Sequence, residues 1–330
     1  MDQKERKVYS NRRIVGFLWK MLKPYRGKFL FASFLRFTGD VFFLYTPYGF
    51  GAIVTFISTY KFGDSTTRVW VLLCLWLAVW IFRSFSLAHA KYLINMISYR
   101  MDFDIELTTV QHFINLDMAW HERENSGNKM KRLTKAMDAV FRMARMWANN
   151  YIEIVVNFIG VIVVMFILNR PISIIMVLFM IVYMWISIKF VRKVAIASNE
   201  VNIGEEHADG LAFEAINNIR TVKVSALGDS FIHRLRSTLD RLAITATDFF
   251  SKTRAHNVVS EMIPNIFRLS VMAYIIYGVM QGQFEVGFLI IFWGYFHNLW
   301  GSMRELSDTT QDFAVAKYAI GRLMDTLDEP

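Results

Sequence analysis

Long apolar stretches alternate with polar ones along this chain of 330 residues. A helix that crosses a membrane needs roughly 20 mostly apolar residues, because the hydrocarbon core is about 30 Å thick and each helical residue adds about 1.5 Å. Six stretches meet this requirement, at residues 29–60, 69–90, 151–168, 172–188, 258–280 and 284–303. The pattern therefore predicts an all-α, polytopic membrane protein with six long transmembrane helices.

The polar gaps between these stretches differ greatly in length. Residues 169–171 and 281–283 are short connections, and each predicts a tight hairpin between two spans. The gaps after the second and fourth spans are far longer, and both repeat apolar residues at helical spacing. These residues are Met130, Leu133, Met137, Val140, Ala144 and Trp147 in the first, and Phe231, Leu235, Leu239, Leu242, Ala246 and Phe249 in the second. We expect each gap to extend its neighbouring spans into water as a long helical hairpin.

Composition and charge agree with a membrane protein and suggest its orientation. Hydrophobic residues make up 54% of the chain and charged residues only 20%, against roughly 25% charged in soluble domains. This balance argues against a soluble enzyme, and the single cysteine excludes a disulfide scaffold. The formal net charge of +9 comes mostly from the N-terminus, the two long gaps and the C-terminal tail, whereas the opposite loops hold only Lys61, Arg68 and Arg170. Positively charged loops stay in the cytoplasm, so we expect both termini and both hairpins there, in a bacterial plasma (inner) membrane, and no nucleic-acid partner.

Four motifs occur in order between spans of these lengths. They are Leu-Lys-Pro-Tyr-Arg-Gly at 22–27, Ala-Trp-His-Glu-Arg-Glu-Asn-Ser-Gly at 119–127, Ile-Arg-Thr-Val-Lys at 219–223, and the tail at 319–330. Together they resemble the transmembrane domain of ABC exporters over nearly the whole chain. The resemblance implies an N-terminus with an amphipathic elbow helix at 1–28, a six-span domain at 29–322, and a linker toward a nucleotide-binding domain at 323–330.

The resemblance also implies two coupling helices, one at the tip of each hairpin. The first contains Trp120, His121, Glu122 and Arg123, and the second, near His207–Ile216, contains His207, Asp209 and Glu214. His121 departs from the second aromatic residue that is usual in the family. We expect Trp120 to anchor the first helix in a groove of the ATPase, because aromatic residues favour interface cores; the alternative is that Trp120 packs against the neighbouring hairpin.

The sequence contains no ATP site of its own. The phosphate-binding motif G-x-x-x-x-G-K-[ST] is absent, and no catalytic triad or zinc motif is present. We therefore expect no cofactor in this chain, with ATP and Mg on a nucleotide-binding domain that is either truncated from it, which the tail favours, or supplied as a separate chain. The family mechanism implies alternating access with a second transmembrane half. A homodimer is the default, because closed two-fold assemblies dominate.

Charged residues within the spans are candidates for a substrate cavity. An unpaired charge inside a bilayer costs roughly 2.5–3.5 kcal/mol or more, so these side chains need water or a charged partner. One hypothesis is an inward-open cavity with a basic belt, suited to an amphiphile, lipid or peptide with an anionic group. The alternative is that the arginines snorkel to the interface or form structural ion pairs. The candidates are Arg36, Asp40, Arg83, Glu261, Asn265 and Arg268.

Two other classes of protein compete with an ATP-driven exporter. One is an ATP-independent carrier or channel, which would need its own energy-coupling groups near the bilayer midplane. The other is a structural membrane protein that uses the hairpins as a docking platform. The complete transporter would be an ATPase, whereas this chain by itself carries no catalytic residues.

Overall fold

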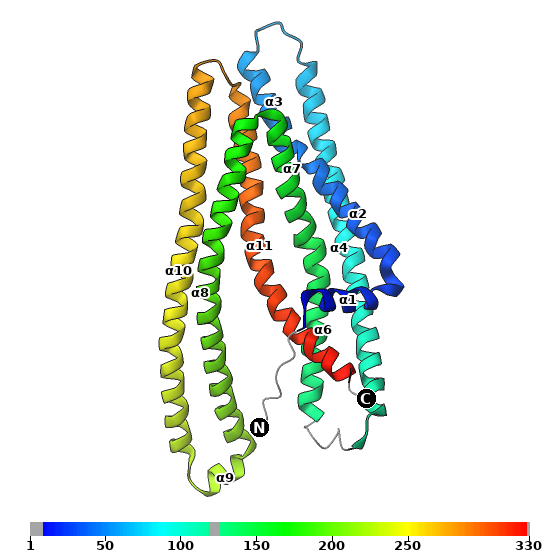
Figure 1. The fold of residues 1–330 in the computed structure, drawn as a ribbon, viewed down its shortest axis with the longest axis vertical. Helices are drawn as coiled ribbons and strands as arrows, with labels where there is room; N and C mark the ends of the chain where they lie inside the picture. The colour runs from blue at the N-terminus through cyan, green and yellow to red at the C-terminus, as the bar shows by residue number, and fades with distance from the viewer. Residues whose placement is uncertain (1–8, 119–125, 329–330) are drawn as a thin grey trace. The chain divides into compact units, whose positions relative to one another are not determined.

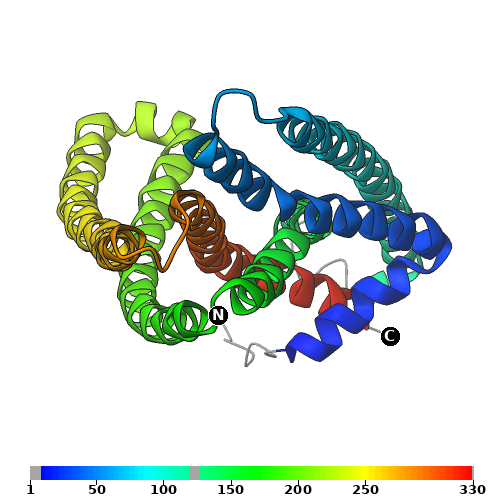
Figure 2. The ribbon, with the colours of Figure 1, turned by 90° about the horizontal axis from the view of Figure 1, so that it is seen from above.

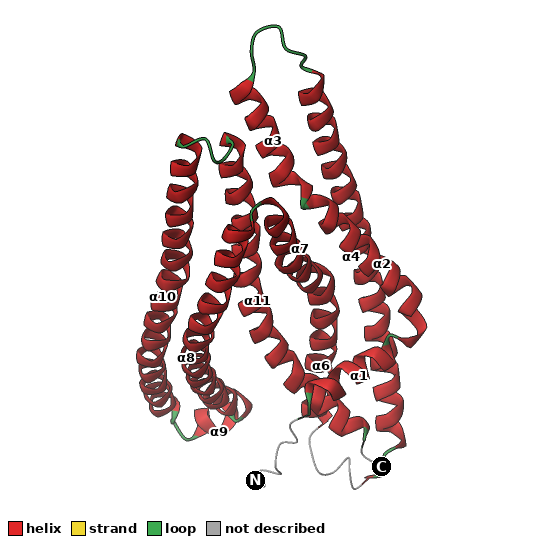
Figure 3. Cartoon of the chain, turned by 45° about the horizontal axis from the view of Figure 1, so that its top comes forward, coloured by secondary structure: helices red, strands yellow, loops and turns green. Residues whose placement is uncertain are grey.

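The computed structural model describes residues 9–118 and 126–328, and all regular secondary structure in these ranges is helical (Figure 3). A 3₁₀ turn, η1 (Lys23–Tyr25), and a π-helical segment, η2 (Trp147–Tyr151), interrupt the α-helices. The α-helices are α1 (Asn11–Met21), α2 (Arg26–Phe43), α3 (Tyr45–Thr59), α4 (Thr67–Asn115), α6 (Ser126–Met146), α7 (Ile152–Leu168), α8 (Arg170–Asn217), α9 (Ile219–Val224), α10 (Gly228–Met280) and α11 (Val286–Leu327).

The chain divides into two compact units, residues 1–174 with 271–330, and residues 175–270. The second unit is a hairpin of α8 and α10 joined by α9 (Figure 1). The rings of Phe179 on α8 and Phe267 on α10 stack with their centroids 3.9 Å apart. Further along the hairpin, a Cβ atom on Gly204 would lie 2.8 Å from the Leu242 side chain, so the absence of a side chain permits close approach of the two helices.

In the first unit, α11 packs against α3, α6 and α7, and α2 packs against α4. One continuous apolar core joins α4, α6 and the C-terminal part of α11 through Ile97, Leu133 and Ile320. Helix α1 lies beside the end of α11 (Figure 2) and buries Ile14 in this core. The two ends of the described chain are therefore held in one cluster.

The first predicted span, residues 29–60, is broken into two helices. Helix α2 ends at Phe43 and α3 begins at Tyr45. Pro47 explains the break, because proline has no N–H to donate to the carbonyl four residues earlier and its ring collides with that carbonyl. The Leu44 carbonyl at the break accepts a hydrogen bond from the Tyr295 hydroxyl of α11 at 2.6 Å. The first span is therefore a helical stretch with a break near its middle, within one candidate membrane span, Lys23–Thr59.

Five helical stretches of the described chain are long and apolar enough to cross a membrane. They are Lys23–Thr59, Thr67–Asn115, Leu133–Leu168, Arg170–Asn217 and Gly228–Met280. Helix α11 is not among them, because polar residues such as His297 and Asn298 lie within its apolar part. Helices α4, α8 and α10 have 49, 48 and 53 residues, more than twice the roughly 20 that a bilayer requires, so they extend well beyond their apolar segments.

Candidate functional site

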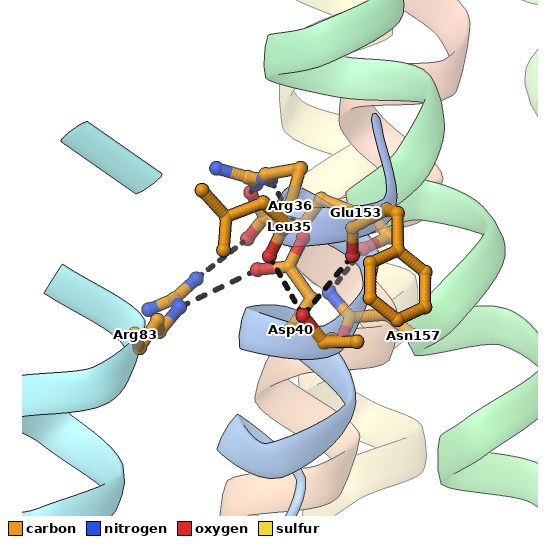
Figure 4. A network of polar contacts seen from close by, with 9 residues as sticks. Leu35, Arg36, Asp40, Arg83, Glu153 and Asn157 are labelled. Atoms are coloured by element: carbon orange, nitrogen blue, oxygen red, sulfur yellow. Dashed lines mark hydrogen bonds and ion pairs between the residues drawn. The ribbon is translucent and has the colours of Figure 1, made fainter. Parts of the chain in front are cut away.

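A network of four charged side chains joins α2, α4 and α7 (Figure 4). Arg36 pairs with Asp40 one turn later at 2.7 Å and with Glu153 of α7. Arg83 of α4 lies 3.4 Å from Asp40 and 3.3 Å from Glu153. Two guanidinium groups thus meet two carboxylates, and the network carries no formal net charge.

Burial makes this pairing necessary. The Arg36 and Asp40 side chains are 3% and 5% exposed, and a buried charge without a partner is strongly unfavourable. Arg83 also lies over the Phe43 ring at 3.6 Å, a cation–π contact. The structure therefore supplies the carboxylate partners that were one of the alternatives predicted from the sequence.

Glu153 is the member of the network that the sequence reasoning missed. It is the only acid in the apolar stretch 152–168 and lies in the first turn of α7. A lone acid in an apolar span needs a charged partner or water, so the sequence could have marked Glu153 as a candidate for an ion pair. Its partners on α2 and α4 could not be identified from local sequence, because 117 positions separate Glu153 from Arg36.

A hydrophilic cavity of about 440 Å³ lies between α7 and α11, and Glu153 belongs to its lining. From α11 come residues between His297 and Asp312, and of the described lining residues Gly301 alone has no polar side chain. The carboxylates of α11 in this lining follow one helical face at spacings of three and four residues. They are Glu305, Asp308 and Asp312.

Two hydrogen bonds connect the walls of the cavity. The Asn157 amide of α7 donates to the Ser302 hydroxyl at 2.8 Å, and the Asn150 amide donates to Glu305 at 2.6 Å. Asn150 belongs to the π-helical segment η2, and such segments occur frequently at functional sites. No group of three or more metal-ligating side chains (His, Cys, Asp or Glu) is found in the described part of the chain.

The predicted cavity residues of the fifth span belong to the second unit. There Arg268 donates to the Asn265 side-chain oxygen at 2.6 Å, and the Asn265 amide donates to the Glu261 carbonyl at 2.8 Å. Pro264 lies inside α10, which continues through it. The structure therefore brings these three residues together with one another, and their role at a substrate cavity stays a prediction.

The residues predicted for coupling have two different outcomes. Trp120, His121, Glu122 and Arg123 lie outside the described residues. His207, Asp209 and Glu214 are exposed residues within α8, so residues 207–216 are not a separate helix.

The short separate helix of the second hairpin is α9. Helix α8 ends at the pair Asn217-Asn218, and asparagine competes for backbone hydrogen bonds at such positions. The Asn218 amide donates to the Glu214 carbonyl at 3.0 Å. Residues 207–216 are therefore part of α8, and the position of the second coupling helix stays a prediction.

Long apolar helices with a paired charge network in their midst define a polytopic α-helical membrane protein. The family model of the ABC transporter transmembrane region matches residues 29–303. The chain therefore belongs to this family, as its motifs predicted.

Relatives and a solved structure agree with this assignment. The β-(1→2)glucan export ATP-binding/permease protein NdvA of Nitrobacter winogradskyi is 21% identical over 250 residues, which cover 74% of this chain and 41% of that protein. The uncharacterized ABC transporter ATP-binding protein YfiC of Bacillus subtilis is 20% identical over 318 residues, covering 94% and 51%. A bacterial Atm1-family ABC exporter with ATP bound matches with a TM-score of 0.74 at 17% identity, covering 92% of this chain and 54% of that one. The chain spans about half the length of these proteins or less, and the structural match shows a shared exporter fold.

Proposed function

We propose that this chain forms the substrate pathway of an ATP-driven exporter. The observation that carries the proposal is the family match over residues 29–303, supported by the fold shared with an ABC exporter. Relatives named as ATP-binding/permease proteins extend well beyond the matched region. ATP and Mg would bind a nucleotide-binding domain, present in cis or in trans, and its hydrolysis would drive alternating access.

Coupling would use the tips of the two hairpins. In the second hairpin we assign docking to α9, because it is a short helix at the turn, with Val222 buried and Arg220 and Lys223 exposed. The exposed His207, Asp209 and Glu214 of α8 would add a polar rim. In the first hairpin, Trp120 with His121, Glu122 and Arg123 would provide the second docking element, with the aromatic ring as its anchor.

The assembled transporter would contain twelve spans from two halves, by default identical chains. Helix α11 would be the sixth span of each half. Several of the polar residues that lower its hydropathy, such as His297 and Asn298, line the cavity, which gives them a role inside a membrane span. Both termini and both hairpins would lie in the cytoplasm, beneath the plasma (inner) membrane.

The substrate expected from the sequence is an amphiphile, lipid or peptide, and the glucan in the name of the Nitrobacter relative adds a carbohydrate to these classes. For Arg36, Asp40 and Arg83 we favour a positioning role, because each makes an ion pair within the network. Glu261, Asn265 and Arg268 remain candidates for contact with substrate.

A fusion protein tests the proposal. A nucleotide-binding domain from a related exporter is joined after Pro330, the fusion is reconstituted in lipid, and ATP turnover and substrate uptake into inverted vesicles are measured. We expect uptake only with ATP, and loss of both uptake and stimulated turnover in Val222→Asp, whereas the control Asp240→Asn, at an exposed position of α10 outside the docking helix, stays active. Uptake without ATP would instead identify a carrier or channel, and a folded fusion with neither uptake nor stimulated turnover would favour a structural docking protein.

A further inference from the structure

Among the residues that the structure describes, none in the lining of the cavity between α7 and α11 has an apolar side chain. Pockets for small molecules are ordinarily lined mostly by hydrophobic and aromatic side chains, so this one is unusual. An acyl chain placed here would meet no apolar side chain of the described lining residues, and would gain less from the hydrophobic effect than in an apolar pocket. The lining therefore disfavours the lipid-like part of an amphiphile.

Charge disfavours an anionic ligand as well. In the described lining, Arg304 is the one arginine or lysine and His297 the one histidine, against Glu153, Glu305, Asp308 and Asp312. The arginines closest behind the α7 wall, Arg36 and Arg83, are already paired with Glu153. An anionic group would therefore meet repulsion from the α11 carboxylates without an unpaired arginine from this network to offset it.

The remaining chemistry is a mixture of hydrogen-bond donors and acceptors. Amides such as Asn150 and Asn157 offer both, and the carboxylates of Glu305, Asp308 and Asp312 are strong acceptors. A hydroxyl group is itself both donor and acceptor, and a hydroxyl that donates to a carboxylate makes a charge-assisted bond, about twice as strong as a neutral one. A molecule with many hydroxyls can use both kinds of partner on the two walls.

The backbone at the cavity gives a second, independent indication of a binding site. The π-helical segment η2 lies at the junction of α6 and α7, and such segments are frequent at functional sites. Its Asn150 reaches across to Glu305 of α11 at 2.6 Å, while Glu153 one turn later is fixed by Arg36 and Arg83. The α7 wall is thus held in place before any ligand arrives, which lowers the entropic cost of binding.

We propose that this cavity binds a neutral, hydroxyl-rich molecule, an oligosaccharide in chemical class, through Asn157 and the carboxylates of α11. That the bound molecule is also the exported one rests on the proposed function. Asp308 and Asp312 are exposed, so they can be substituted without disturbing the core.

The test compares two double variants of the full chain in lipid nanodiscs, without nucleotide. The probe is a neutral β-glucan oligosaccharide, and binding is measured by calorimetry. D308A/D312A removes the acceptors, and we expect binding about tenfold weaker or more. D308N/D312N keeps an acceptor oxygen at each position, and we expect a loss of only about threefold. Asp240→Ala, at an exposed position of α10 in the other unit, serves as the matched control and leaves affinity unchanged, and equal thermal unfolding of all variants verifies folding.

Three results would overturn the proposal. One is the absence of glucan binding, and another is glucan binding that neither double variant weakens. The third is preferential binding of spermine with an equal loss in both double variants, which identifies a cation site because only charge then matters. Binding without nucleotide does not depend on ATP coupling, so a fusion that fails to couple ATP contradicts the proposed function and leaves the binding result intact.

Discussion

Arg36 of α2 and Glu153 of α7 form an ion pair that closes the charge network between three helices. A substitution that removes either side chain leaves the network of two arginines and two carboxylates with one uncompensated charge. Breaking a fully buried pair costs about 3–5 kcal/mol, and because Glu153 is 30% exposed we expect a smaller loss, about 2 kcal/mol, for Glu153→Leu.

A double-mutant cycle checks this explanation. In R36M/E153L the remaining charges, Asp40 and Arg83, still pair with each other. We therefore expect the double variant to be more stable than the sum of the two single losses predicts. Thermal unfolding in detergent measures all four proteins, and strictly additive losses would contradict the network.

Asp102 of α4, beyond the apolar part of that helix, should make stability depend on pH. Burial, with the nearby charges of Asp138 and Glu106, raises the pKa of Asp102 from 3.8 to about 6. The folded state therefore binds the proton more tightly, and stability falls as pH rises from about 4 to 6.

Asp102→Asn removes this penalty, so we expect it to raise the melting temperature at pH 7.5 and to have little effect near pH 4.5. The exposed-site variant Asp209→Asn controls for a general loss of negative charge. An equal shift at both pH values would show that the carboxyl group does not titrate in this range.

The Tyr9 hydroxyl donates to Asp325 at 2.5 Å, so the N-terminal segment is bonded to the end of α11. Tyr9→Phe loses only this bond, with an expected cost of about 1 kcal/mol, whereas Tyr9→Ala also removes a ring that is 6% exposed and should cost about 3–5 kcal/mol. Hydrogen exchange over residues 317–327 should accelerate slightly in the first variant and strongly in the second. Equal protection in both would mean that this segment does not stabilise α11.

Helices α3 and α11 approach each other so closely at Gly51 and Gly287 that a side chain at either position would not fit. A Cβ atom on Gly51 would lie 2.6 Å from the Gly287 carbonyl oxygen, and a Cβ atom on Gly287 would collide with the Gly51 carbonyl. We expect Gly287→Ala to be among the most destabilising single substitutions, because neither backbone can move aside.

Gly16→Ala is the matched control for this substitution. Gly16 lies inside α1 with nothing within 4 Å of its would-be Cβ, so this variant should gain up to about 1 kcal/mol. Expression and thermal unfolding of both variants measure the difference. Tolerance of Gly287→Ala would contradict the packing of α11 against α3.

The sequence pattern was sufficient to predict the features that depend on residues close together in the chain. Apolar periodicity gave the helical class and the length of helices such as α8 and α10, and the motifs gave the family. The break at Leu44 could also have been predicted from the sequence, because Pro47 cannot donate to the carbonyl four residues earlier and its ring collides with that carbonyl.

What could not be predicted depends on contacts between distant segments. Glu153 meets Arg36 and Arg83 only after three helices have packed. In the same way, Asp308 and Asp312 of α11 belong to a polar extension by sequence, and only the packing of α11 against α7 makes them one wall of a cavity.

The measurement closest to the central claim asks whether the tip of the second hairpin contacts an ATPase domain on the cytoplasmic side. With the exposed native cysteine removed by Cys74→Ser, a cysteine is introduced by Lys223→Cys, at an exposed position of α9. We expect it to be protected from an impermeant thiol reagent added outside intact cells, and to cross-link to a nucleotide-binding domain in membranes. Labelling from outside, or no cross-link to that domain, would contradict a chain that couples ATP hydrolysis to export.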